Sequence, residues 1–361
     1  MSSAAPLTPE ELVLRENVVA EAAVPSEVSE QFRRRELYFS APSRPALDAK
    51  RLVQRVDSPG GDQVWVVNGS EQTIQGIRGQ RARLASRPAK RRRSQAVATS
   101  RPAWVEQLYH PKLSVGRDFP VMNRASGIAV DVLAAGAALD ARRVYYPGGY
   151  PWHCIGMVFT WDDASLTGYS ARASGVLVGN STVLTAGHMV PWESDNWKML
   201  FVPGYYDGQS ALGPGAASWI TEAHCWNTNN VTSQDTAVLR LHTPLGTTLG
   251  HLGVKVYDSS LQDRGYWTLA GYATTVAGGA RPSFQAGISI TGQHTDGDSI
   301  ELEHSGHAAS GDSGGPLFGF WDDGAHIVGT TSGTESGGGT QIAAGGRALV
   351  DLVSWAESNW K

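Results

Sequence analysis

Residues 144–361 consist of short apolar runs separated by turn-forming residues, and this pattern limits the fold more than any other feature of the chain. The runs are rich in Val, Ile, Leu and Thr and are bounded by Gly, Asn, Asp and Pro. Such spacing is typical of an all-β sandwich or barrel. The runs predict strands at 174–178, 182–185, 237–241, 267–272, 288–291 and 326–331. At 348–360 the spacing of the apolar residues instead predicts a terminal amphipathic helix.

Residues 1–143 differ in character from the rest of the chain. They carry 22 basic and 15 acidic side chains, a formal charge of +7, whereas residues 144–361 carry 8 and 19, a charge of −11. Of the 42 glycines, 34 lie in the second part. The composition therefore indicates two regions that meet near Arg143.

The first region offers a few local signals. Thr8-Pro9-Glu10-Glu11 has the pattern of a capping box at a helix start. Residues 64–67 read as a short strand that ends in a turn at Asn68-Gly69. Residues 78–102, rich in Arg, Ser, Pro and Ala, predict a linker or a disordered stretch. Residues 128–141 predict a second helix.

Composition excludes several classes of protein. No window approaches 18 uncharged apolar residues, so we expect no membrane-spanning helix. Two cysteines are too few for a disulfide-dense scaffold or a four-cysteine zinc site. Cys154 and Cys225 form one disulfide or stay free thiols, which spacing alone does not decide. The acidic residues at 296–303 and His304 complete no calcium or zinc motif, so we expect a solvated loop and no metal.

The basic run at 81–93 raises the alternative of nucleic-acid binding, because clustered Lys and Arg bind phosphates by counterion release. No aromatic residues interleave with this run, and no recognised nucleic-acid-binding fold flanks it. A solvated linker or processing site fits the run better. We therefore expect no nucleic-acid partner.

Three segments carry the residues of a nucleophilic site, in the order His188, Asp235 and Ser313. A serine hydroxyl needs a histidine to accept its proton, and that histidine needs a carboxylate to fix its tautomer. The glycines around Ser313 let backbone N–H groups point at a developing oxyanion. The G-x-S-x-G elbow of α/β-hydrolases is the weaker interpretation, because that fold requires the order Ser, acid, His.

With this order and spacing, the chain resembles the chymotrypsin/trypsin-like serine proteases, including their bacterial, glutamyl-endopeptidase-like members. The segments that carry the resemblance are Thr185-Ala186-Gly187-His188, the strand that begins at Asp235-Thr236-Ala237, and Gly311-Asp312-Ser313-Gly314-Gly315-Pro316. The resemblance covers residues 144–361. It implies an all-β fold of two Greek-key six-stranded β-barrels with a C-terminal helix, preceded here by a partly disordered N-terminal segment. It implies a monomeric, extracellular serine endopeptidase that takes protein or peptide substrates and needs no cofactor, although the N-terminus shows no conventional signal peptide.

The same resemblance assigns roles to residues. His188 would be the general base, Asp235 its orienting carboxylate and Ser313 the nucleophile, with the N–H groups of Gly311 and Ser313 as the oxyanion hole. The resemblance also implies that the usual disulfide next to the histidine is absent, because Met189 and Ser174 occupy its two positions.

A substrate pocket follows from the resemblance as well. His307 would lie at its base, and no acid is present there to select Lys or Arg, whereas a histidine can accept an acidic or polar side chain. The walls of the pocket and the strand that pairs with substrate would be formed by Ala308, Ala309, Ser310, Ser332, Gly333 and Thr334.

The basic pair Arg142-Arg143 precedes a segment that resembles the new N-terminus of an activated protease. We expect residues 1–143 to be a propeptide that binds its own enzyme, cleavage after Arg143, and insertion of the Val144 amine beside Asp312. The opposite charges of the two regions favour such docking. The alternative is that the arginines are an ordinary linker pair.

Two rival functions also stay open, an inactive binding or regulatory protein with this fold and a serine esterase.

Overall fold

The computed structural model describes much of the chain and nearly all of its second part. Complete residues are described at 5–8, 11–12, 24–33, 95–105, 142–161, 169–194, 197–226, 232–334 and 340–360. The backbone alone is described for β1 (Leu37–Phe39), β2 (Val53–Asp57), β3 (Gln63–Val67) and β4 (Arg83–Leu84). The helix predicted at 128–141 and most of the basic run lie outside the described residues.

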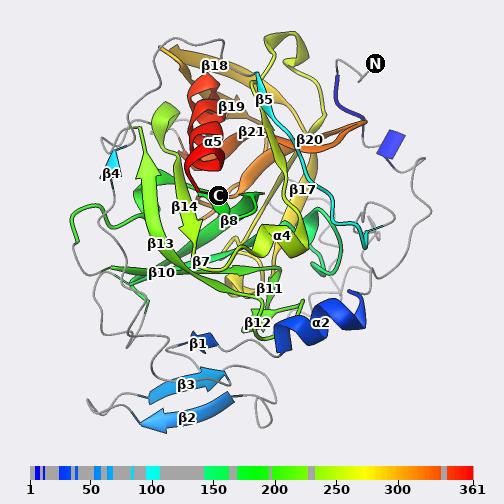
Figure 1. Cartoon of the computed structure of the whole chain (residues 1–361). Helices are drawn as coiled ribbons and strands as arrows, with labels where there is room; N and C mark the ends of the chain where they lie inside the picture. Colours follow the sequence, from blue (N-terminus) through cyan, green and yellow to red (C-terminus); the bar gives the residue numbers. More distant parts are fainter. Residues whose placement is uncertain are drawn as a thin grey trace, which may run out of the picture.

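The first barrel is a closed sheet of six antiparallel strands (Figure 1). The strand order β10-β7-β8-β9-β14-β13 is closed by pairing of β10 with β13. All seven residues of β7 are buried, because its side chains face either the barrel interior or the rest of the molecule. The strands are β7 (Ile155–Trp161), β8 (Ala171–Gly179), β9 (Thr182–Thr185), β10 (Lys198–Pro203), β13 (Ser218–Cys225) and β14 (Ala237–Leu241).

The second sheet has the strand order β18-β19-β22-β21-β20-β16-β17. β17 and β18 lie at opposite ends of this strand order, yet only Ser289 separates them along the chain. The first and last strands are therefore close in space, and the sheet curls into a second barrel. The fold is thus the chymotrypsin-like all-β architecture. The strands are β16 (Trp267–Gly271), β17 (Ser283–Ile288), β18 (Ile290–Asp296), β19 (Ser299–His304), β20 (Pro316–Trp321), β21 (Gly324–Thr334) and β22 (Gln341–Gly346).

The remaining described elements are short, apart from the C-terminal helix α5 (Arg347–Asn359). This helix contacts β14 of one barrel and β22 of the other and buries Leu349, Leu352 and Val353. The others are α4 (Leu245–Leu249), β6 (Arg143–Val144), β11 (Tyr205–Tyr206), β12 (Gln209–Ser210), β15 (Gly253–Lys255) and the 3₁₀ turns η3 (Trp152–Cys154), η6 (Ser259–Leu261) and η7 (Ala277–Gly279).

Most strand predictions in the second part are confirmed. The bounds of β9 and β14 match the prediction to the residue, and β8, β16, β21 and α5 match within a few residues. The strand predicted at 288–291 is wrong, because this stretch spans the end of β17 and the start of β18. The apolar pattern continues through the bend at Ser289, so it gives no sign of the break.

Parts of the first region belong to the same core as the barrels. The capping box at the first helix is confirmed, because the Glu11 N–H donates to Thr8 Oγ1 at 3.1 Å and the Thr8 N–H donates to a Glu11 carboxylate oxygen at 2.8 Å. In α2 (Ser26–Arg33), Phe32 is fully buried. The pairing of β1, β3 and β2 confirms the strand predicted at 64–67.

The prediction of a linker or disorder at 78–102 is wrong where the structure describes that stretch. β4 adds a parallel strand to β13, and β5 (Ala96–Val97) pairs with β15. Each added strand bonds to backbone groups of its partner, β13 or β15, and pairing of this kind needs no long apolar run in the added strand. Val97 is nevertheless buried in the core.

The two cysteines are buried thiols and do not form a disulfide with each other, so the disulfide alternative is wrong for this structure. Burial raises the pKa of Cys154 well above its ordinary value. Within the described part of the chain, no helix has the length and apolar character needed to cross a membrane. The same residues include no group of three or more His, Cys, Asp or Glu side chains placed to hold a metal.

Candidate active site

His188 and Asp235 lie at the ends of neighbouring strands of the first barrel. His188 is in η4 (Gly187–Met189), directly after β9, and Asp235 stands between η5 (Thr232–Gln234) and β14. β9 and β14 pair antiparallel with Thr185 opposite Ala237, so the residues just beyond these two positions leave the barrel together. This register brings the two side chains into contact: His188 Nδ1 lies 2.7 Å from Asp235 Oδ2.

Asp235 accepts three hydrogen bonds. The backbone N–H of His188 donates to Oδ1 at 2.8 Å, while the His188 ring and the Ser332 hydroxyl, the latter at 2.6 Å, both reach Oδ2. Burial alone would raise the pKa of Asp235, but the hydrogen bonds and the charge of His188 lower it below its ordinary value. The carboxylate is therefore ionised and can only accept, so His188 Nδ1 carries the proton and donates it.

Ser313 follows β19 in a loop that leads into β20 of the second barrel, and its backbone is fixed to the first barrel. The Ser174 N–H of β8 donates to the Ser313 carbonyl oxygen at 2.9 Å. Gly314 has φ +82°, and a Cβ there would come within 2.2 Å of Thr185 Oγ1 and 2.7 Å of Ala186 N. Only glycine allows this approach, which sets the Ser313 segment against the residues that lead to His188.

Gly311 has a fixed peptide orientation. The Thr274 N–H donates to the Ser310 carbonyl oxygen at 2.8 Å. Because a trans peptide points its N–H opposite to its C=O, the Gly311 N–H points away from Thr274. Gly311 has φ +94°, and a Cβ would come within 2.3 Å of the Tyr272 carbonyl oxygen. The conformation that presents this N–H therefore requires glycine.

Ser174 supports the same loop with its side chain, which the sequence did not reveal. Its hydroxyl donates to the Gly311 carbonyl oxygen at 2.8 Å and accepts from the Tyr272 N–H at 2.9 Å. The sequence interpretation treated Ser174 only as the site of a missing cysteine. A small hydroxyl residue inside an apolar strand was the available signal, since a buried serine must find partners.

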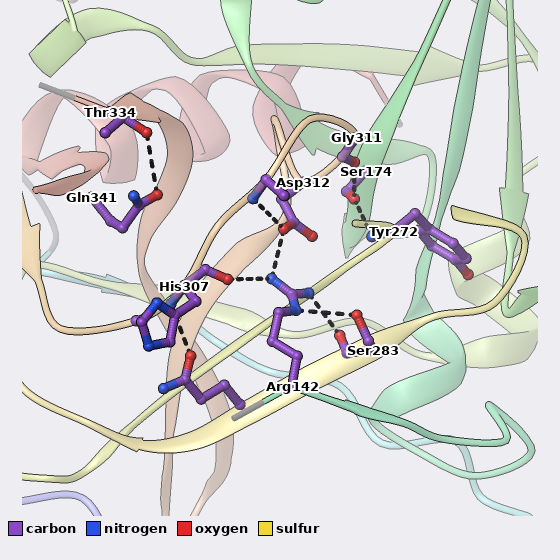
Figure 2. A network of polar contacts seen from close by, with 12 residues as sticks. Arg142, Ser174, Tyr272, Ser283, His307, Gly311, Asp312, Thr334 and Gln341 are labelled. Atoms are coloured by element: carbon purple, nitrogen blue, oxygen red, sulfur yellow. Dashed lines mark hydrogen bonds and ion pairs between the residues drawn. The ribbon is translucent and has the colours of Figure 1, made fainter. Parts of the chain in front are cut away.

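Asp312 is fully buried and forms an ion pair with Arg142 (Figure 2). Arg142 Nη1 lies 2.6 Å from Asp312 Oδ2, which also accepts from the Ala309 N–H at 2.9 Å. Burial raises the pKa of Asp312, and the Arg142 charge and these hydrogen bonds oppose that rise. In this uncut chain Val144 lies on β6, paired with Ser283 and 43% exposed, so Arg142 is the residue that reaches Asp312.

Comparison with known proteins agrees with this arrangement. The family model described as Trypsin matches residues 159–354, more than half of the chain. The chain belongs to the trypsin family. It is therefore a serine endopeptidase that acts on proteins or peptides. A search of curated proteins found no match.

The solved structure of a Glu endopeptidase in complex with MPD has a similar fold. It has 20% sequence identity and a TM-score of 0.50, and the match covers 60% of this chain and 96% of that one. Protease Anisep from Arthrobacter nicotinovorans and the thermostable serine protease AL20 from an extremophilic microorganism each have 20% identity and a TM-score of 0.43. These two matches cover 56% and 57% of this chain and 93% and 97% of theirs.

The residues expected to line the substrate pocket of this trypsin-family chain gather around the 307–312 loop and β21. His307 is exposed, and its backbone N–H donates to Gln285 Oε1 at 2.8 Å. Ala308 and Ser310 follow it on the same loop. On β21, the Thr334 hydroxyl donates to Gln341 Oε1 at 3.4 Å (Figure 2). Among the described residues, no atom would lie within 4 Å of a Cβ on Gly333.

Proposed function

We propose that this endopeptidase cleaves peptide bonds with a His188–Asp235–Ser313 triad and an acyl-enzyme intermediate. The observation that carries the proposal is the 2.7 Å contact between His188 Nδ1 and an ionised Asp235 whose side chain is 10% exposed. Because Nδ1 is engaged, Nε2 is the ring nitrogen left for proton transfer. A histidine held in this tautomer by a carboxylate is what a serine nucleophile needs in order to lose its proton.

The proposed reaction has two stages, acylation of Ser313 and hydrolysis of the acyl-enzyme by water. Ser313 Oγ attacks the scissile carbonyl carbon as its proton passes to His188 Nε2, and the carbonyl oxygen becomes an oxyanion. The C–N bond then breaks, and His188 returns the proton to the leaving amine. Water repeats the sequence on the acyl ester, which releases the carboxylic acid product and restores Ser313.

The oxyanion is proposed to bind the N–H groups of Gly311 and Ser313. The orientation of the Gly311 peptide, set by Thr274 and Ser174, supports this assignment. Preorganised donors of this kind contribute roughly 10²–10³-fold to kcat each. The proposed substrate pocket, formed by His307, Ala308, Ser310, Thr334 and the strand at Ser332 and Gly333, has no acid at its base, so we expect poor cleavage after Lys or Arg.

We also propose that residues 1–143 are a propeptide and that residues 144–361 are the protease domain. Cleavage after Arg143 would separate the two. An extracellular location is proposed because trypsin-like proteases are commonly secreted. A monomer remains the expected state.

The test is hydrolysis of casein and of a fluorogenic peptide library by wild type, Ser313→Ala and His188→Ala. Ser259→Ala, an exposed serine on η6, serves as the matched control. We expect both site variants to lose about 10⁴-fold or more in kcat, as triad removal does in serine proteases generally, and the control to match wild type. Unchanged cleavage by Ser313→Ala would overturn the proposal, and hydrolysis of esters without any peptide cleavage would favour an esterase.

A further inference from the structure

Arg142 lies in a buried site between the two ends of the 307–312 loop. Its guanidinium donates to Asp312 Oδ2 at 2.6 Å, to the His307 carbonyl oxygen at 3.1 Å, and to the hydroxyl and carbonyl oxygens of Ser283 at 3.1 and 3.0 Å (Figure 2). Its side chain is 4% exposed and that of Asp312 is 0% exposed. A surface ion pair would contribute little, but a buried pair with this many directed hydrogen bonds fixes the geometry of its surroundings.

The contacts of Arg142 join three parts of the second barrel. Ser283 belongs to β17, His307 begins the pocket loop, and Asp312 precedes the nucleophile. The loop closes on itself through the Asp312 N–H, which donates to the Ala309 carbonyl oxygen at 3.0 Å. Between these fixed points lies Gly311, whose N–H is proposed to bind the oxyanion. A rigid Arg142 site therefore restrains the loop that carries this N–H, whose direction Thr274 and Ser174 set.

We propose that Arg142 is the positioning residue of the oxyanion loop, and that it makes the loop competent in the uncut chain, so that cleavage between Arg143 and Val144 is not required for activity. The inference rests on the proposed function of Ser313 and Gly311. It replaces the expectation that a freed Val144 amine pairs with Asp312. A guanidinium and a protonated N-terminal amine are both cations, but the guanidinium is planar and presents several donors in a fixed geometry.

The placement of Val144 supports this proposal. Val144 pairs with Ser283 and Arg143 with Phe284 on β17, and Val144 is 43% exposed. For its amine to reach Asp312, β6 would have to leave β17 and the Arg142 guanidinium would have to leave a buried carboxylate. Both changes break contacts that the uncut chain already makes.

Segments that precede Arg142 are also anchored to the protease core. Trp104 donates from Nε1 to the Thr248 carbonyl oxygen at 2.9 Å and stacks on His153. The Thr99 hydroxyl donates to the His251 carbonyl oxygen at 3.1 Å, and the Leu7 N–H donates to the Phe320 carbonyl oxygen at 2.6 Å. These contacts anchor the described segments 5–8 and 95–105, and we expect Arg142 to stay in its site even in a chain that is nicked after Arg143.

The experiment compares full-length wild type, Arg142→Ala, Arg142→Lys and Arg143→Ala by kcat, KM, thermal unfolding and intact mass of the active species. We expect Arg142→Ala to lose about 10²–10³-fold in kcat, the size of a lost oxyanion donor, with a smaller change in KM. Arg142→Lys should recover part of the loss, because an ammonium supplies the charge without the planar donor set. Millimolar ethylguanidinium should partly restore kcat to Arg142→Ala, which a general loss of stability would not allow. Arg143→Ala should keep wild-type activity at its full-length mass.

Two results would overturn the inference. The first is a kcat for Arg142→Ala that equals that of wild type. The second is that Arg143→Ala is inactive while the active form of wild type begins at Val144. If Arg142→Ala fails to fold by circular dichroism, the Arg142→Lys and Arg143→Ala pair decides the question. In either case wild-type activity that depends on Ser313 keeps the proposed function intact. A wild type with no activity and no acylation of Ser313 would instead refute the proposed function itself.

Discussion

The Ser174 hydroxyl donates a hydrogen bond to the Gly311 carbonyl oxygen across the boundary between the two barrels, at 2.8 Å. It also accepts from the Tyr272 N–H, and the Ser174 backbone N–H donates to the Ser313 carbonyl oxygen. One residue of the first barrel thus holds both ends of the segment 311–313. Together with Arg142, which bonds to Asp312 and His307 of the same loop, it holds the segment that we propose binds the oxyanion.

We expect Ser174→Ala to lower kcat by about tenfold or more. The substitution removes a buried bond to Gly311 and leaves the Tyr272 N–H without its acceptor, a loss of roughly 1–3 kcal/mol. Steady-state kinetics and urea unfolding measure the effects on the loop and on the fold. Ser170→Ala, which removes an exposed hydroxyl bond to the Thr160 carbonyl oxygen just before β8, is the control and should keep its kcat.

A second prediction concerns Ser332→Ala. Its hydroxyl donates to Asp235 Oδ2 at 2.6 Å, and this bond is one of those that lower the pKa of Asp235 against the effect of burial. Its removal raises that pKa and loosens the carboxylate that orients His188. Since a hydrogen bond to a charged group contributes about 1.5–3 kcal/mol, kcat/KM should fall by about one to two orders of magnitude. Ser358→Ala, on the exposed face of α5, should leave kcat/KM unchanged.

Stability should fall with pH below 6.5 because of buried neutral histidines. Burial lowers the pKa of His153 from its ordinary 6.5 to about 4, although the bond to the Leu249 carbonyl oxygen opposes that shift. His304 and His326 are lowered to about 4 by burial as well. Between pH 6.5 and 4 these histidines bind protons in the unfolded chain but not in the folded chain. The free energy of unfolding therefore decreases as the pH falls, by about 3 kcal/mol at most for each histidine.

The variant His153→Gln tests this account of the pH dependence. Glutamine can still donate to the Leu249 carbonyl oxygen but does not titrate. Urea unfolding at pH 7 and at pH 4.5 should therefore show a smaller loss of stability in the variant than in wild type. The exposed His242 is the control position, and His242→Gln should keep the wild-type dependence. Equal pH dependence in His153→Gln and wild type would contradict the assignment.

The two thiols should be unreactive in the folded protein. Burial raises the pKa of Cys154 well above its ordinary value, and both cysteines are fully buried. Since the thiolate is the reactive form, Ellman's reagent should find close to no thiol in the native protein and both thiols in denaturant. Reducing agent should leave the melting temperature unchanged. A loss of stability on reduction would mean that a disulfide forms after all.

The sequence predicted the contact between His188 and Asp235, but it did not predict the residues that hold the 307–313 segment in place. Runs of alternating and fully apolar residues predicted β9 and β14, and the predicted pairing of His188 with Asp235 agrees with their contact. Arg142 was read only as part of a basic pair, because its burial depends on the long-range approach of Ser283, His307 and Asp312. Ser174 was missed for the same reason. The break at Ser289 and the strands β4 and β5 depend on pairing partners far along the chain, which local patterns do not encode.

Intact and peptide mass spectrometry after treatment with diisopropyl fluorophosphate tests most directly whether Ser313 is the nucleophile. Ser313 Oγ should form a bond to phosphorus, fluoride should leave, and the hydroxyl proton should pass to His188. We expect one adduct, located on Ser313, that fails to form in Ser313→Ala and forms far more slowly in His188→Ala and Arg142→Ala. No adduct in wild type, or one at another residue that survives Ser313→Ala, would contradict it.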